Sequence, residues 1–146
     1  MKRRTSVAAV AALALLALTA CGSKEASSEA EGEGGNNVAV TLDDYAIRPE
    51  VTTLSAGEVT FKVSNAGATE HEMVVIRTDL DPADIPFADH EANEEAPGMT
   101  PIGEVEEVQP GEAQDLVLTL EPGSYILLCN LPKHFERGMV TKIEVA

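Results

Sequence analysis

The sequence predicts an all-β sandwich of about seven or eight short strands. Three observations support this prediction. Short apolar runs alternate with polar residues, as in Val59 to Val63, which is the pattern of a half-buried strand. Turn-forming pairs such as Pro110-Gly111 and Pro122-Gly123 separate the runs. No long amphipathic helical stripe is present, so residues 38–146 are expected to form one β-domain.

The expected strands follow one another along this domain. They are residues 38–42, 51–54, 59–63, 71–77, 104–108, 116–120, 125–129 and 139–145, with a corner at 43–49. Only two Tyr, three Phe and no Trp occur in the chain, so Val and Leu must fill the core. β-Branched and aliphatic residues of this kind pack well between sheets.

One long stretch, residues 79–103, breaks the strand pattern. It contains four prolines and no helical apolar stripe, so we expect at most one short turn of helix, near residues 89–95. Loops of this length are usually functional or mobile. His90 and Met99 lie in this stretch and could form a second, weaker metal contact.

The N-terminus is predicted to be an export signal. Residues 2–4 are basic, and the apolar run 7–18 is too short to span a bilayer, which is typical of a signal peptide over residues 1–20. The run ends in Leu-Thr-Ala-Cys21, which resembles a bacterial lipoprotein cleavage box. By that resemblance Cys21 becomes the first mature residue and carries a lipid. The alternative is an ordinary signal peptide cut after a small residue.

Residues 21–37 are predicted to be the lipidated cysteine and a disordered tether. After Cys21 the segment contains no large apolar residue and therefore cannot bury a core. The expected organisation is a signal peptide (1–20), this tether (21–37) and one folded domain (38–146). Such a protein would be exported and anchored to a membrane on the side facing away from the cytoplasm.

The chain is strongly acidic, with 25 Asp and Glu, 10 Lys and Arg, and a net charge of −15. This charge opposes binding to nucleic acid, because the phosphate backbone is itself negative. It favours an encounter with a protein partner that presents a basic docking surface.

The two cysteines pose a pairing question. If Cys21 is lipidated, Cys129 has no disulfide partner, which is unusual in an oxidising compartment. Metal ligation explains a lone thiol there, since a bound thiolate is occupied. A Cys21–Cys129 disulfide is the alternative, and the cleavage box argues against it.

Cys129 also belongs to a group of metal-binding residue types. His134 and Met139 follow it in the spacing Cys-x4-His-x4-Met, and His71 opens another apolar run. Two histidines, one cysteine and a weak axial methionine hold the single copper ion of electron-transfer sites. Taken singly, each residue has an ordinary structural explanation, such as a core cysteine or a hydrogen-bonded histidine.

Together these pieces resemble the cupredoxin (plastocyanin/azurin) family of blue copper proteins. The matching pieces are Asn65-Ala-Gly67, His71-Glu-Met-Val-Val, Gly123-x-Tyr125-x-Leu127-x-Cys129 and Cys129-x4-His134-x4-Met139. The resemblance implies a Greek-key β-sandwich with one copper ion that cycles between Cu(I) and Cu(II). It also implies that His71, Cys129 and His134 bind the ion and that Met139 is a long axial ligand.

Two further residues are candidates for supporting the ligands. In many members of the family an asparagine follows the first histidine and pins the ligand loop, whereas Glu72 takes that position here. That brace is therefore expected to be missing or different. Asn130 follows the cysteine and is expected to help order the loop.

The leading hypothesis is a monomeric type 1 (blue) copper protein that transfers single electrons between redox partners outside the cytoplasm. It would perform no bond chemistry and would not be an enzyme. The alternative is a copper chaperone, storage or sensor lipoprotein that uses the same ligands. A thiol enzyme based on Cys129 and His134 lacks a third group to orient the histidine. A multicopper oxidase needs more than the three histidines present.

Overall fold

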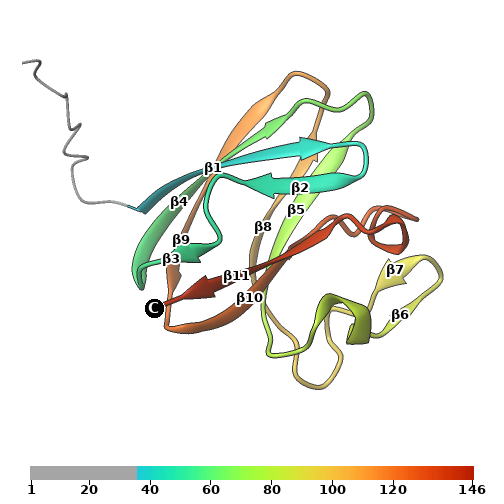
Figure 1. Ribbon diagram of the computed structural model, residues 1–146. Coiled ribbons are helices and arrows are strands. Elements are labelled where there is room, and N and C mark those ends of the chain that lie inside the picture. The colour runs from blue at the N-terminus through green and yellow to red at the C-terminus, as the bar shows by residue number, and fades with distance from the viewer. Residues whose placement is uncertain (1–35) are drawn as a thin grey trace, which may run out of the picture. The chain divides into compact units, whose positions relative to one another are not determined.

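The computed structural model of the protein describes residues 36–146, so the expected signal peptide and most of the expected tether lie outside the described residues. The described residues form eleven strands and two short 3₁₀ helices (Figure 1). The strands are β1 (Asn36–Asp43), β2 (Ala46–Pro49), β3 (Thr53–Leu54), β4 (Gly57–Asn65), β5 (His71–Arg77), β6 (Phe87–Ala88), β7 (Glu91–Ala92), β8 (Thr100–Val108), β9 (Ala113–Leu120), β10 (Gly123–Leu128) and β11 (Val140–Val145). The helices are η1 (Pro82–Asp84) and η2 (Phe135–Arg137).

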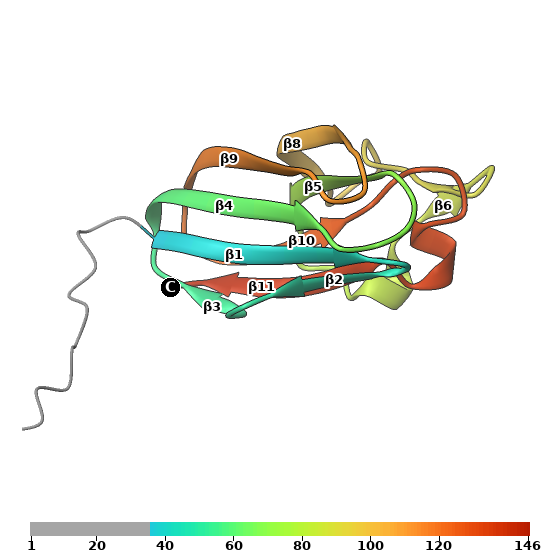
Figure 2. The ribbon, with the colours of Figure 1, turned by 90° about the horizontal axis from the view of Figure 1, so that it is seen from above.

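Nine of these strands build two sheets that face each other, which confirms the predicted all-β sandwich, and β6 and β7 form a separate two-stranded sheet (Figure 2). One sheet has the order β2-β1-β4-β9 and the other the order β3-β11-β10-β5-β8. β1 and β4 run parallel, as do β3 and β11, while the other pairings are antiparallel. The strand number exceeds the expected seven or eight because the expected corner contains β2 and the irregular stretch contains β6 and β7, which have two residues each.

The core between the sheets follows the predicted alternation. On β4, Val59, Phe61 and Val63 are fully buried while Lys62 is exposed. On both sheets every second side chain of a strand points into this core, because successive residues of a strand point to opposite faces. The same core contains Cys129 and Met139, so the candidate ligands are built into the end of the main hydrophobic core.

A second, smaller core lies on the outer face of the β5-β10 pair. Val74 and Ile76 on β5 pack there with Ile126 and Leu128 on β10. The segment 78–99 covers this face with apolar side chains that include Ile85, Ala92 and Met99. The two central strands are therefore buried on both faces, which explains why their sequences are continuous apolar runs. This cover is the structural role of the irregular stretch.

The helical turn in this stretch is at η1, Pro82–Asp84, and not near residues 89–95 as expected. Proline fits the first turn of a helix, because its missing N–H has no acceptor there. Residues 89–92 instead form the turn and second strand of the β6–β7 hairpin. Among the described residues, no helix has the length and apolar character needed to cross a membrane.

The topology places the candidate ligands at one end of the second sheet. β10 and β5 pair antiparallel, with Leu128 opposite Val74. The end of β10 therefore lies beside the beginning of β5, which brings Cys129 next to His71. His134 and Met139 lie in the connection from β10 to β11, which passes over the same end.

Candidate metal centre

Three donor atoms converge at this end of the sandwich. The Nδ1 atoms of His71 and His134 are 3.2 Å apart. The Sγ atom of Cys129 is 3.2 Å from Nδ1 of His134 and 4.0 Å from Nδ1 of His71. Donor atoms that share one metal ion at about 2.0–2.3 Å lie at such separations. The three predicted residues, 58 and 5 positions apart in sequence, thus form a single cluster.

The burial of the cluster is uneven. The side chains of His71 and Cys129 have no exposed surface, whereas His134 is partly exposed. Met139 is also fully buried, and its carbonyl oxygen accepts the Cys129 N–H at 3.1 Å. Its own N–H donates to the carbonyl of His134, also at 3.1 Å. The fourth predicted residue is therefore held against the other two residues of its loop.

The tautomer of His71 follows from its neighbour Asp44. His71 Nε2 lies 2.9 Å from Oδ1 of Asp44. An ionised carboxylate only accepts hydrogen bonds, so Nε2 carries the proton and donates it. In the neutral ring, Nδ1 then keeps the lone pair, and this atom faces the cluster. This is the form in which an imidazole binds a metal, oriented by a carboxylate behind it.

Asp44 is held in place by other contacts. Its carboxylate accepts the N–H of Ala68 at 2.8 Å and the hydroxyl of Thr69 at 2.7 Å. These bonds, led by the Ala68 N–H, together with His71 lower the pKa of Asp44 to about 2. The carboxylate is therefore ionised at neutral pH. Sequence reasoning did not identify Asp44, because nothing local links a residue in the β1–β2 corner to a histidine on β5.

Gly67, in the motif Asn65-Ala-Gly67, lies against the hydrogen bond between Asp44 and His71. A Cβ atom at Gly67 would lie 2.7 Å from Oδ1 of Asp44 and 2.9 Å from Nε2 of His71. Only glycine leaves room for the Asp44–His71 hydrogen bond at this point. Asn65 shapes the same turn, because its Oδ1 accepts the Gly67 N–H and its Nδ2 donates to the carbonyl of Val108.

The ionisable donors are suited to a metal. Burial raises the pKa of the Cys129 thiol to about 11, although contacts from the backbone of Glu72 and Leu131 offset part of the effect. Burial also lowers the pKa of His134, as do the neighbouring His71 and Arg137. The imidazole of His134 is therefore ready to bind, whereas the thiol must lose its proton first. Two imidazoles and a thiolate, with a thioether nearby, form a donor set that suits copper.

Proton release on metal loading is the first prediction. At pH 9 a thiol of pKa about 11 is still protonated, so loading with Cu(I) should release close to one proton per protein. A thiol of ordinary pKa, about 8.5, would release only about a quarter of a proton at that pH. The measurement is anaerobic titration in weak buffer with a pH electrode. Cys129→Ser is the control and should release none, and a wild-type value near a quarter would contradict the buried thiol.

The ligand loop is braced by the residue that replaces the family asparagine. Oε1 of Glu72 accepts the N–H of Asn130 at 2.8 Å. Burial raises the pKa of Glu72, with further contributions from nearby carboxylates including Glu104 and Glu94. The brace was expected to be missing or different. It is different, because a carboxylate forms it in place of an amide.

Asn130 also ties the ligand loop to the segment that covers the sheet. Its side chain accepts the N–H of Ala92 at 2.6 Å and donates to the carbonyl of Ala92 at 3.1 Å and to Glu94 at 2.7 Å. The carbonyl of His90 accepts the N–H of Lys133 at 3.0 Å on the same hairpin. The β6–β7 hairpin therefore clamps the loop that carries Cys129 and His134.

Removal of this clamp is the second prediction. Asn130→Ala deletes three side-chain hydrogen bonds, so we expect the free energy of unfolding to fall by about 1–2 kcal/mol. Urea unfolding of the metal-free protein measures the change. The matched control is Asn93→Ala, an exposed asparagine in the same segment whose side chain makes one weak contact. A loss for Asn130→Ala no larger than that of the control would contradict the clamp.

The possible second metal contact between His90 and Met99 is not formed. His90 Nδ1 lies 2.8 Å from Glu136, and Met99 is buried in the smaller core. Within residues 36–146, His71, Cys129 and His134 form the one group of three clustered metal-binding side chains.

Comparison with known proteins agrees with this geometry. The family model of the cupredoxin-like domain matches residues 9–141. No curated protein matches the chain. Among solved structures, reduced auracyanin from the photosynthetic bacterium Roseiflexus castenholzii is 22% identical, with a TM-score of 0.55, over 77% of this chain and 96% of that one.

Two further structures are similar. Auracyanin A, described as a blue copper protein of Chloroflexus aurantiacus, is 20% identical over 77% of this chain and 100% of its own, with a TM-score of 0.54. Rusticyanin from Thiobacillus ferrooxidans is 16% identical over 77% of each chain, with a TM-score of 0.50. At these identities the structures show a shared fold, which the family model attributes to most of the chain.

Proposed function

This chain belongs to the cupredoxin-like family, and we propose that it is a type 1 copper protein that transfers single electrons outside the cytoplasm. The observation that carries the proposal is the convergence of Cys129 Sγ with the Nδ1 atoms of His71 and His134. These three would bind one copper ion, with Met139 as a weak axial ligand. The ion would supply the one-electron couple between Cu(I) and Cu(II).

The protein's own contribution is to hold the ligands still. His71 is fixed by Asp44, and the loop that carries the other ligands is fixed by Glu72 and Asn130. Ligands held by a rigid scaffold in this way change position little between two oxidation states. Burial of His71 and Cys129 keeps bulk water away from the donors, and the partly exposed His134 offers the route by which an electron can leave.

Copper reconstitution tests the proposal. The full chain loaded with Cu(II) should bind one ion per protein and show an intense visible thiolate-to-copper band. It should also show a narrow copper hyperfine splitting in its EPR spectrum and a reversible one-electron couple. A copper-loaded protein that shows neither the thiolate-to-copper band nor a reversible one-electron couple would contradict the proposal.

Copper exchange distinguishes the alternative of a chaperone, storage or sensor protein. A carrier gives copper quickly to a chelator or an apo-protein, whereas an electron carrier retains it. The buried donors and the clamped loop favour retention. We expect copper to pass to a chelator slowly, because the metal must wait for a local opening of the fold.

Anchoring through Cys21 is part of the same proposal. The sequence before and after this residue supports an exported lipoprotein with a flexible tether, and residue 21 lies outside the described residues. Cys21→Ser should move the protein from the membrane fraction to the soluble extracytoplasmic fraction, as followed by fractionation and immunoblotting. An unchanged distribution between the two fractions would rule the lipid anchor out.

A further inference from the structure

The two imidazoles of the site differ in what holds their rings. The side chain of His71 is fully buried, and its Nε2 atom is hydrogen-bonded to Asp44. The ring of His134 is partly exposed, and its Nδ1 atom lies 3.2 Å from both Cys129 Sγ and His71 Nδ1. Within residues 36–146, no polar group lies within hydrogen-bond reach of the Nε2 atom of His134. Some other contact must therefore orient this second ring.

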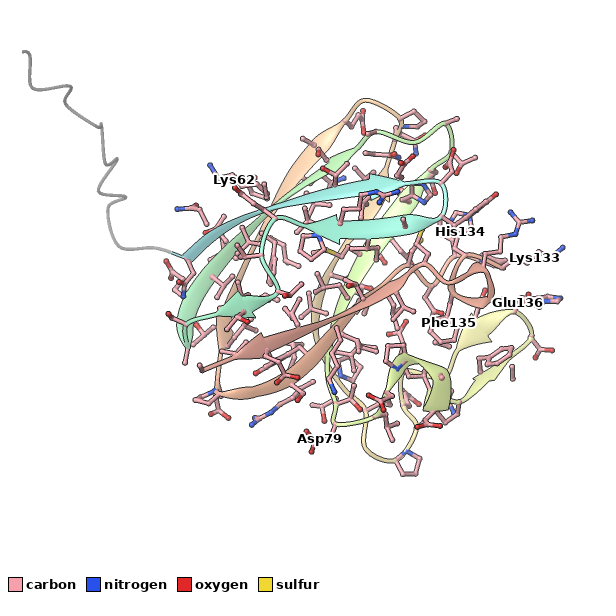
Figure 3. All side chains as sticks on the ribbon, viewed as in Figure 1. Lys62, Asp79, Lys133, His134, Phe135 and Glu136 are labelled. Carbon is pink, nitrogen blue, oxygen red and sulfur yellow. The ribbon has the colours of Figure 1, made fainter. Side chains whose placement is uncertain are left out.

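The ring of Tyr45 makes such a contact. His134 lies at the end of the sandwich, beside the turn from β1 to β2 that contains Tyr45 (Figure 3). The centroids of the two rings are 5.0 Å apart and their planes are 77° apart, which is the edge-to-face arrangement that aromatic rings favour. The His71 ring meets His134 at the same centroid distance of 5.0 Å. Of the two rings that contact His134, that of Tyr45 belongs to no predicted ligand.

Tyr45 is itself held from two sides. Its side chain is half-buried and packs against the main hydrophobic core. The guanidinium carbon of Arg137 lies 4.4 Å from the centroid of its ring, which is the geometry of a cation–π contact. The N–H of Arg137 donates to the carbonyl of His134 at 3.1 Å, so the cation belongs to the same turn of the ligand loop. The ring of Tyr45 is therefore fixed between the core and the loop that carries His134.

We propose that Tyr45 positions the imidazole of His134, an inference that rests on the function proposed above. Asp44 and Tyr45 are consecutive residues of the β1–β2 corner, so this one corner orients both imidazoles of the site. Asp44 acts through a hydrogen bond, and Tyr45 acts through the contact of its ring. Without that ring, the partly exposed side chain of His134 is free to rotate toward solvent.

The metal-free full chain tests this proposal without copper. In the wild type, NMR coupling constants between the α and β protons of His134 should be those of one side-chain rotamer. Tyr45→Leu should move them to the averaged values of several rotamers, whereas Tyr45→Phe keeps the ring and should leave them unchanged. The matched control is Phe87→Leu, which removes a ring that packs on Phe135 in the same loop. A single rotamer in Tyr45→Leu, or equal averaging in Phe87→Leu, would overturn the proposal.

A second variant covers the case in which Tyr45→Leu does not fold. Tyr45→Met then takes its place in this metal-free test, because a flexible thioether chain fills a similar space without a ring. The result is judged in the same way: averaging of the His134 rotamer supports the role of Tyr45, and a single rotamer overturns it.

The reduction potential gives a readout that a loss of stability alone would not move. When His134 binds less well, the ion depends more on the Cys129 thiolate and the Met139 thioether, which are soft ligands that favour Cu(I). We expect Tyr45→Leu to weaken Cu(II) binding about tenfold more than Cu(I) binding, which raises the potential by about 59 mV. Tyr45→Phe should keep the wild-type potential. An unchanged or lower potential in Tyr45→Leu would contradict the proposal.

The two tests separate this proposal from the proposed function. If the wild-type protein shows no reversible copper couple, the function fails, and the rotamer of His134 in the metal-free protein still decides whether Tyr45 positions the ring. If the couple is present and Tyr45→Leu keeps both the wild-type rotamer and the wild-type potential, the role of Tyr45 fails alone.

Discussion

Cys129→Ser should abolish the intense visible band of the copper-loaded protein while leaving the metal-free fold intact. The band of a type 1 site depends on a thiolate bound to copper, and Cys129 is the free cysteine of the described residues. A serine hydroxyl does not ionise at neutral pH. It is also a harder and weaker donor than a thiolate, so it stabilises Cu(I) poorly. We expect complete loss of the band and of the reversible couple, measured by visible spectroscopy and voltammetry.

The fold should tolerate this substitution. Serine is close to cysteine in volume, and its hydroxyl can hydrogen-bond to His134 Nδ1, which lies 3.2 Å from the sulfur. The free energy of unfolding of the metal-free protein should change by less than about 1.5 kcal/mol. Met73→Leu, a buried sulfur on β5 outside the cluster, is the matched control and should keep the band. A band that persists in Cys129→Ser would remove the thiolate from the site.

The sequence predicted the sandwich because its strands alternate with a period of two. Val59, Phe61 and Val63 face the core as expected, since a half-buried strand leaves that pattern in any context. The β10–β11 loop was predictable for a similar reason. Cys129 and His134 lie only five positions apart, so local spacing alone brought them together.

Long-range contacts of the site were not predictable in the same way. Asp44 orients His71 across 27 positions, and this depends on how the β1–β2 corner meets the turn before β5. The sequence also did not show that residues 79–103 cover a face of the sheet, because scattered apolar side chains leave no periodic pattern. Glu72 was noted as a departure from the family, but only the structure shows that its carboxylate accepts the Asn130 N–H.

Gly67→Ala should distort the metal site, although Gly67 is not one of the predicted ligands. The added Cβ would meet Oδ1 of Asp44 at 2.7 Å and Nε2 of His71 at 2.9 Å, so one or both side chains must move. His71 is fully buried and has little room to move, which makes the substitution costly. Overpacking of this kind typically costs about 1–3 kcal/mol of stability.

Gly67→Ala should also lower the affinity for copper. Groups that orient a ligand from behind typically change metal affinity about 10- to 100-fold when they are lost. We expect a loss of that size for Gly67→Ala, together with an altered visible band, as measured by competition with a chelator of known affinity. The matched control is Gly103→Ala on β8, where a Cβ would lie 2.7 Å from the flexible end of Leu118. It should cost stability and leave the copper spectrum unchanged.

A double variant identifies which contact is responsible. Asp44→Ala removes the carboxylate that lies 2.7 Å from the new Cβ, so Gly67→Ala should cost less stability in that background than in the wild type. The coupling between the two sites should exceed about 0.5 kcal/mol, because residues in direct contact are not additive. Additive losses would show that Gly67 does not act through Asp44. The Asp44–His71 hydrogen bond would then not be what requires glycine at position 67.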